Sequence, residues 1–213
     1  MISHDHKCIF THIPKTGGMC LFNHLTPVSD SETFGSGEAG YEEVVQKYHI
    51  NHKKIKEIQS QIDQKTFDDY FKFTFVRNPW AKIVSLFFFA RVKKAQRYVF
   101  NHLSLSPNCS FKDFVLAIKS ARNHPHHPVL DSQVSFIYDI DDKECLDFIG
   151  RTENLQNDFD IICEKIGAPK KQLRKINVSK HKHYTEYYDE ETKQIVAEKY
   201  AEDIEYFGYK FGE

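Results

Sequence analysis

The sequence has no long run of apolar residues and almost no net charge, and each absence excludes a class of protein. Nowhere in its 213 residues is there a stretch approaching the roughly 18 consecutive apolar residues that suggest a transmembrane helix. The formal net charge is −1, so no overall positive field would attract nucleic acid or an anionic membrane surface. We therefore expect no membrane span and no nucleic-acid partner.

The cysteines lack any motif spacing. No two cysteines have the CxxC spacing of a zinc or redox site. The five cysteines are Cys8, Cys20, Cys109, Cys145 and Cys163. An odd number of isolated cysteines is typical of reduced, mostly buried thiols in a reducing compartment. Residues 1–7 also lack the regions of a secretory signal peptide, so we expect a cytoplasmic protein without disulfides or a bound metal.

What the sequence does contain is enough apolar material for a folded core. Hydrophobic residues make up 40% of the chain and aromatic residues 14%, while 28% of the residues are charged. This balance is typical of a well-packed globular protein and not of a disordered segment. The length suits a single domain, so we predict one domain over residues 1–213.

Short apolar segments alternate along the chain with segments of helical periodicity. We predict strands at residues 8–13, 71–77 and 145–151. We predict helices at residues 19–25, 53–62, 79–98, 111–121, 155–166 and 189–206. Asn78 and Pro79 suit the N-cap and the first position of the third of these helices. Strands alternating with helices indicate an α/β fold with a central, mostly parallel sheet flanked by helices.

The first motif with chemical content is Ile13-Pro14-Lys15-Thr16-Gly17-Gly18, between a predicted strand and a predicted helix. Backbone N–H groups at a helix N-terminus bind anions, and glycines let a phosphate approach the backbone closely. Lys15 adds a mobile positive charge. The order differs from a Walker A loop, in which the lysine follows the glycines. The motif therefore indicates either an anion-binding loop of another kind or a structural turn.

The second motif is Phe75-Val76-Arg77-Asn78-Pro79-Trp80, followed by Ser85. Arg77 stands at the C-terminal end of a predicted strand, the edge where α/β proteins bind ligands. Ser85 follows about two turns into the next helix. An arginine fork and a hydroxyl at these positions can hold a second phosphate, whereas Trp80 is expected to pack in the core.

Basic residues are concentrated in the same region. From residue 77 to residue 97 the chain has six basic residues and no acidic one. They are Arg77, Lys82, Arg91, Lys93, Lys94 and Arg97. Two interpretations stay open, a solvated helix face and a cleft that receives an anion.

Together the two motifs resemble those of sulfotransferases that use 3′-phosphoadenosine-5′-phosphosulfate (PAPS), especially the carbohydrate branch. Residues 13–18 look like the family's 5′-phosphosulfate loop, and residues 75–80 with Ser85 look like its 3′-phosphate motif. Residues 148–155 and 177–179 resemble later segments of the family. The resemblance implies a fold like that of P-loop NTPases and sulfuryl transfer from PAPS to a hydroxyl, with a carbohydrate as the expected acceptor.

The resemblance also implies roles for the residues of the donor site. It implies that Lys15 contacts the phosphosulfate bridge and stabilises the leaving group without a metal ion. It places Arg77 and Ser85 at the 3′-phosphate. The other residues implied for the donor site are Pro14, Thr16, Gly17, Gly18, Met19, Arg151, Ser179 and Lys180. Two of these have a second interpretation, because Arg151 can pair with Glu153 and Lys180 can belong to a solvated basic loop.

The chain departs from the family pattern just after the glycines. The family usually has hydroxyl-bearing residues at these positions, and this chain has Met19 and Cys20. We therefore expect a side-chain donor to the 5′-phosphate to be missing, so that the contact falls to backbone N–H groups.

A general base must take the proton of the acceptor hydroxyl, and a neutral histidine or a carboxylate suits this step. Related uronyl sulfotransferases have a histidine between the two donor motifs. His52 is the best match to that place, and His49 is the second choice. The carboxylate alternatives are Glu38, Glu42 and Glu43. Gln133 is a candidate contact to the acceptor.

Two other functions fit some of these motifs. One is an ATP-dependent, P-loop-like phosphotransferase, which the absence of a Walker lysine and hydroxyl pair disfavours. The other is a nucleotide- or glycan-binding module of the sulfotransferase fold without catalysis, which Met19 and Cys20 leave open. No motif identifies the acceptor or the oligomeric state.

Overall fold

A computed structural model describes residues 1–25, 52–92, 98–121, 128–173 and 181–213. The chain divides into two compact units. The sheet unit consists of Met1–Val76 and Ser135–Asn177, and the helical unit consists of Arg77–Val134 and Val178–Glu213. One domain over residues 1–213 stays a prediction.

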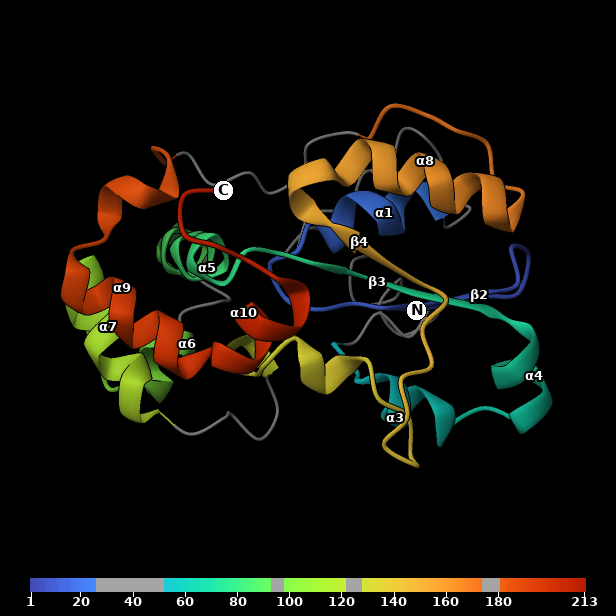
Figure 1. Ribbon diagram of the computed structural model, residues 1–213, viewed down its shortest axis with the longest axis horizontal. Coiled ribbons are helices and arrows are strands. Elements are labelled where there is room, and N and C mark those ends of the chain that lie inside the picture. The colour runs from blue at the N-terminus through green and yellow to red at the C-terminus, as the bar shows by residue number, and fades with distance from the viewer. Residues whose placement is uncertain (26–51, 93–97, 122–127, 174–180) are drawn as a thin grey trace. The chain divides into compact units, whose positions relative to one another are not determined.

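The sheet unit is built around a sheet of four strands. In spatial order they are β1 (Ile2–Ser3), β2 (Cys8–Thr11), β3 (Phe71–Val76) and β4 (Phe148–Arg151). β1 pairs antiparallel with β2, whereas β2, β3 and β4 are parallel (Figure 1). The mostly parallel sheet confirms the predicted α/β fold, and it is consistent with the P-loop-like fold that the resemblance implied.

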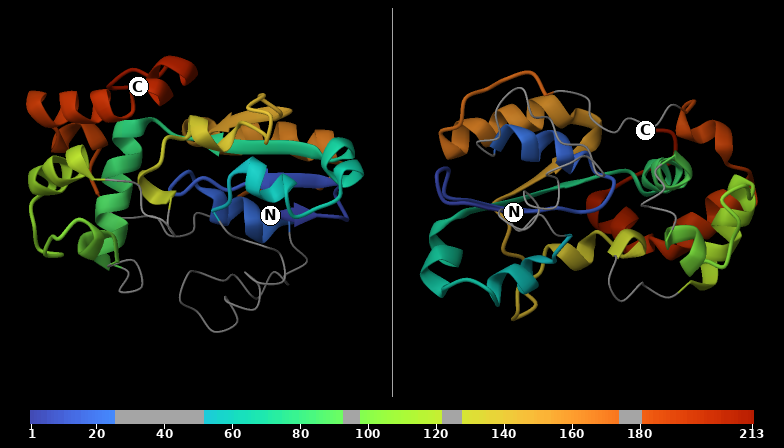
Figure 2. Two further views of the ribbon diagram at one scale, coloured as in Figure 1. Left: turned by 90° about the horizontal axis from the view of Figure 1, so that it is seen from below. Right: turned by 180° about the vertical axis from the view of Figure 1, so that it is seen from behind.

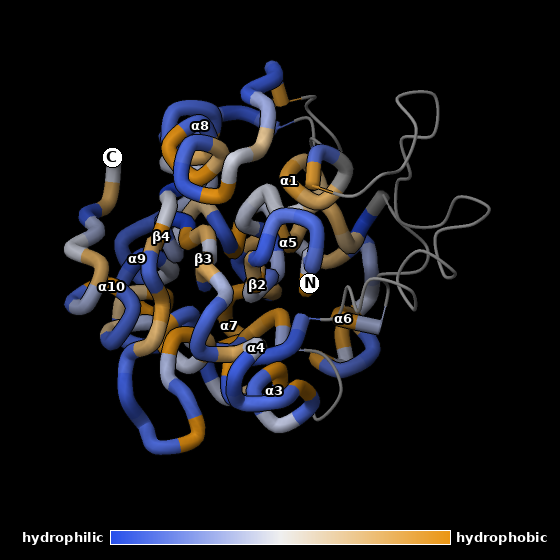
Figure 3. The backbone as a smooth tube through the Cα atoms, turned by 90° about the vertical axis from the view of Figure 1, so that its right-hand side faces the viewer, coloured by the Kyte–Doolittle hydropathy of each residue, from blue (hydrophilic) through white to orange (hydrophobic). Residues whose placement is uncertain are grey.

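Helices cover both faces of this sheet. α1 (Gly18–Leu25) and α8 (Leu155–Ile166) lie on one face, and α3 (Ile55–Gln59) and α4 (Gln64–Asp69) lie on the other (Figure 1). Cys8 and Phe10 belong to the core of the first face, and Ile9 belongs to that of the second. This alternation follows from the two-residue period of a strand. α8 is hydrophilic on one side and hydrophobic on the other (Figure 3), as expected for a helix on a sheet.

The helical unit packs around one apolar helix. Its elements are α5 (Pro79–Val92), α6 (Tyr98–His102), α7 (Phe111–Ser120), η2 (Pro128–Leu130), η5 (Tyr184–Tyr187), α9 (Glu190–Lys199) and α10 (Ala201–Phe207) (Figure 2). Of the two other 3-10 helices, η4 (Thr152–Asn154) belongs to the sheet unit, and η3 (Val134–Phe136) begins in the helical unit and ends in the sheet unit. α5 has apolar residues on all sides and is mostly buried, with Ile83, Val84 and Ala90 all 0% exposed.

α5 begins where the sequence predicted. Asn78 Oδ1 accepts hydrogen bonds from the backbone N–H groups of Trp80 at 3.1 Å and Ala81 at 3.4 Å, which is the bonding of an N-cap. Trp80 is buried, and its indole Nε1 donates to Lys193 O at 3.0 Å. The prediction that Trp80 packs in the core is therefore confirmed.

The C-terminal helix differs from the prediction, because residues 189–206 form two helices and not one. The break is at Tyr200, whose backbone has φ −114° and ψ 30°. Tyr200 is 1% exposed, and its hydroxyl donates to Leu130 O at 3.2 Å. The break thus coincides with a side chain that is anchored in the core. β1, α4 and α6 were not predicted, because such short elements have no clear periodicity.

The cysteines have the predicted character. All five are free thiols, and Cys8, Cys20 and Cys163 are buried. Burial raises the pKa of Cys8 to about 12 and that of Cys163 to about 11, so both stay protonated and unreactive at neutral pH. Within the described ranges, no helix has the length and apolar character needed to cross a membrane.

Candidate active site

The predicted phosphosulfate loop is a tight turn in the sheet unit, between the end of β2 at Thr11 and the start of α1 at Gly18. Two of its residues have left-handed backbones, Lys15 with φ +70° and Gly17 with φ +83°. Glycine adopts this conformation freely, whereas lysine does so at a cost of about 1–3 kcal/mol. The surrounding structure must therefore hold Lys15 in place, and such strain is often found at functional sites.

Two threonine hydroxyls stabilise the turn. Thr16 Oγ1 donates to Ile13 O at 2.9 Å, and Thr152 Oγ1 lies 2.9 Å from Thr16 O and 3.0 Å from Val76 O. Because a hydroxyl has one proton, Thr152 shares it between the turn and the end of β3. No sequence pattern marks Thr152 for this role, since it is 136 residues from Thr16 along the chain.

Gly18, the first residue of α1, packs directly against the imidazole of His12. A Cβ atom at position 18 would lie 2.2 Å from Cδ2 and 2.3 Å from Nε2 of His12. His12 is buried and stacks on Phe10, with 5.5 Å between the ring centroids. The second glycine of the motif is therefore required by a close contact as well as by any bound anion.

We expect Gly18→Ala to destabilise the protein even though alanine favours a helix. The gain in helix propensity is at most about 1 kcal/mol, whereas overpacking a buried site typically costs about 1–3 kcal/mol. The His12 ring is buried, so the clash should outweigh the propensity. Urea unfolding of the wild type and the variant measures the difference in the free energy of unfolding.

A second background isolates the cause of this effect. In a His12→Ala background the ring is gone, so Gly18→Ala should cost much less, or should stabilise the protein slightly. An equal cost in both backgrounds would contradict the proposed clash and would point to the backbone of residue 18.

His12 is held neutral by its surroundings. Burial lowers the pKa of His12 well below the usual 6.5, and His52, the N-terminal amino group and Lys15 lower it further. His12 was not predicted as a site residue. The signal that marks it is a histidine between a buried strand and a predicted anion-binding turn.

His52 lies beside this ring in the sheet unit, with 4.4 Å between the two imidazole centroids. Its Nδ1 is 3.0 Å from the backbone oxygen of His12. A carbonyl oxygen can only accept, so Nδ1 carries the proton in this contact. In the neutral ring Nε2 then has the lone pair, which is the tautomer that a general base requires. The structure thus brings the predicted base next to the residue that precedes the phosphosulfate loop.

In the helical unit, Arg77 follows directly after the end of β3 at Val76. The side-chain amide of Gln133 pairs with both backbone groups of Arg77. Its Oε1 accepts from Arg77 N and its Nε2 donates to Arg77 O, each at 2.9 Å. Gln133 is 0% exposed and its amide is engaged with Arg77, so its contact with the acceptor stays a prediction. Ser85 lies in α5 and is also buried.

Two members of the basic cluster bond to backbone oxygens of the helical unit. Lys82 is 0% exposed, and its Nζ donates to Asp131 O at 3.0 Å and lies over the ring of Tyr200. Arg91 donates to the backbone oxygens of Pro107 and Cys109. These two cations are bonded to carbonyl groups of the helical unit. Lys93, Lys94 and Arg97 lie outside the described residues.

The other predicted site residues divide between the units. Residues 14–19 and Arg151 are in the sheet unit, together with His52. Arg151 ends β4 opposite Val76 in the register, and its backbone N–H donates to Asp158 Oδ2 at 2.7 Å. The predicted residues that lie outside the described ranges are Ser179, Lys180, His49, Glu38, Glu42 and Glu43. Within the described ranges, no group of three or more His, Cys, Asp or Glu residues could hold a metal ion.

Comparison with known proteins gives the family that the motifs resemble. The chain matches the sulfotransferase family over residues 1–210. It is also similar to an uncharacterized protein of Archaeoglobus fulgidus, with 31% identity over 131 residues, which are 60% of this chain and 92% of that protein. No solved structure matches. Because the family match covers nearly the whole chain, this protein belongs to the sulfotransferase family.

Proposed function

We propose that this protein transfers a sulfuryl group from PAPS to the hydroxyl of an acceptor, and that the acceptor is a carbohydrate. The observation that carries the proposal is the turn between β2 and α1. It combines a lysine held at φ +70° with a glycine at φ +83° directly before a helix N-terminus. A turn of this kind suits an anion, because it combines a cation with backbone N–H groups at a helix N-terminus.

The residues of the turn would bind and orient the donor. The backbone N–H groups from Thr16 to Met19 stand at the start of α1 and would hold the 5′-phosphate, since Met19 and Cys20 offer no side-chain hydroxyl. Lys15 would neutralise the negative charge that develops on the leaving phosphate oxygen. Arg77 and Ser85 would bind the 3′-phosphate, and Arg151, Ser179 and Lys180 are further proposed donor contacts.

The proposed transfer is in line. A bond forms between the acceptor oxygen and sulfur while the bond between sulfur and the 5′-phosphate oxygen breaks. His52 Nε2 takes the proton that the acceptor hydroxyl loses. The hydrogen bond from Nδ1 to His12 O supports this role, because it fixes both the tautomer and the orientation of the ring.

Two assays test the proposal against its alternatives. The desulfated product, 3′-phosphoadenosine-5′-phosphate (PAP), should raise the melting temperature far more than ATP with Mg²⁺ does, because the proposed site recognises a 3′-phosphate. Labelled PAPS should then give labelled product with a panel of carbohydrate acceptors. Stronger stabilisation by ATP with Mg²⁺ would favour a phosphotransferase, and PAP binding without any transfer would favour a binding module.

A further inference from the structure

The side chain of Gln133 continues the hydrogen-bond pattern of a strand along the backbone of Arg77. A residue in a β-ladder exchanges its N–H and C=O with a neighbouring strand. Arg77 makes both bonds with a single amide, each at 2.9 Å. The backbone of Arg77 is therefore held on both its polar groups, although β3 ends one residue earlier at Val76.

Asp203 determines which way this amide points. Gln133 Nε2 has two protons; one goes to Arg77 O, and the other goes to Asp203 Oδ2 at 3.2 Å. If the amide were flipped, its oxygen would face a carbonyl oxygen and a carboxylate with no proton between them. The carboxylate thus selects the orientation in which Gln133 satisfies both groups of Arg77.

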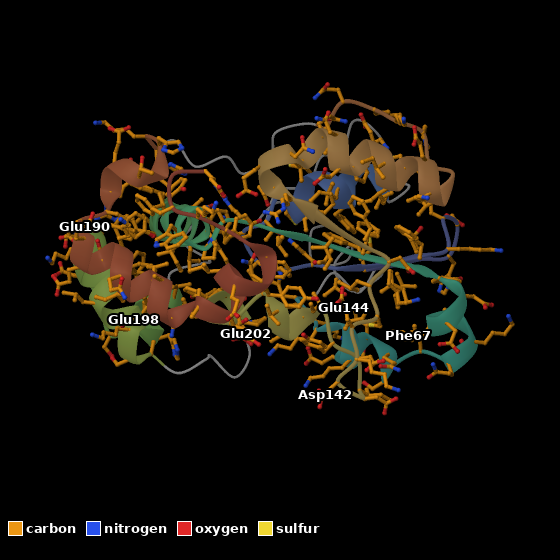
Figure 4. All side chains as sticks on the ribbon, in the orientation of Figure 1. Phe67, Asp142, Glu144, Glu190, Glu198 and Glu202 are labelled. Atoms are coloured by element: carbon orange, nitrogen blue, oxygen red, sulfur yellow. The ribbon has the colours of Figure 1, made fainter. Side chains whose placement is uncertain are left out.

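Asp203 is itself anchored in the helical unit. It lies in the first turn of α10, is 0% exposed, and its Oδ1 accepts from Ser132 Oγ at 2.6 Å and from Val134 N at 3.1 Å. Its neighbour Glu202, labelled in Figure 4, lies 3.1 Å from the same hydroxyl, so the two carboxylates share the one Ser132 proton. A carboxylate buried in this way is stable only with such partners, and its charge also counteracts the effect of burial on the pKa of Lys82.

We propose that Gln133 and Asp203 are positioning residues for the 3′-phosphate contact. Asp203 orients Gln133, and Gln133 fixes the backbone from which the Arg77 side chain starts. This inference rests on the proposed role of Arg77. It gives the C-terminal helix α10 a part in discriminating PAPS from nucleotides without a 3′-phosphate, although α10 carries no residue of either donor motif.

The test compares the binding of PAP and of adenosine-5′-monophosphate by calorimetry on the full chain. Arg77→Ala should weaken PAP binding by about 10- to 100-fold and leave monophosphate binding within about twofold. Gln133→Met, which keeps the length of the side chain and removes its amide, should weaken PAP binding by about tenfold with the same selectivity. Asp203→Asn should cause a similar loss, because an amide at position 203 no longer dictates the orientation of Gln133.

Two controls separate positioning from general damage. In an Arg77→Ala background, Gln133→Met should have little further effect on PAP binding, since both variants act through the same contact. Thr192→Val removes a buried hydroxyl that bonds to Asp189 in the same unit. It should lower stability and leave the ratio of the two affinities unchanged.

The outcomes separate a failure of the positioning role from a failure of the proposed function. If Gln133→Met weakened both ligands equally, or if its effect added fully to that of Arg77→Ala, the positioning role would be wrong and the donor assignment would stand. If the wild type itself bound PAP no better than the monophosphate, the proposed function would fail, and the positioning role would fail with it.

Discussion

Replacing His52 with alanine should lower kcat by about 10²–10⁴-fold and leave the affinity for PAP nearly unchanged. The imidazole is proposed to touch the acceptor and not the nucleotide, so its loss removes the proton acceptor without removing a donor contact. The wild-type rate should also fall toward acidic pH, because protonated Nε2 cannot accept the proton of the hydroxyl. Steady-state kinetics with labelled PAPS across pH, with calorimetry for PAP, measures both effects.

His24 is a matched control for this variant. It lies in the same unit, and its Nε2 also bonds to a backbone oxygen, that of Pro169 at 2.7 Å. His24→Ala should therefore reproduce any general effect of removing a histidine and keep kcat within about twofold of the wild type. If His49→Ala or a variant of Glu38, Glu42 or Glu43 were the inactive one, the base would be that residue and not His52.

The second large effect is expected at Lys15. Lys15→Ala should lower kcat by about 10²–10³-fold, because the leaving phosphate oxygen would lose its neutralising charge. The free energy of unfolding should change by no more than about 0.5 kcal/mol, since the residue is in a loop. Single-turnover measurements with labelled PAPS, together with urea unfolding, separate the chemical effect from the structural one.

The left-handed backbone of Lys15 allows two controls. Lys15→Gly should be at least as stable as the wild type, since glycine relieves the strain, and yet be as inactive as Lys15→Ala. Lys7 has φ +45° in the turn between β1 and β2, so Lys7→Ala makes the same change in a similar conformation and should keep full activity. Near-normal turnover in Lys15→Gly would show that the ammonium group is not needed.

The sequence by itself determined the features that depend on near neighbours. The start of α5 follows from Asn78 and Pro79, because an N-cap and the first helical residue act within one turn. The turn at residues 13–18 follows from its glycines, and the central strands follow from short apolar segments. These signals are local, so the α/β fold and the donor motifs could be predicted without knowing which parts of the chain meet.

Only the tertiary structure decided the partners of the site residues. His52 meets His12 across 40 residues, and Gln133 meets Arg77 across 56. Lys82 shows the same limit. Its position on a basic helix suggested contact with solvent or with an anion, whereas its neighbours bury it completely. A hydrogen bond or a buried charge depends on groups that folding brings together from distant parts of the chain, and no pattern among adjacent residues specifies that encounter.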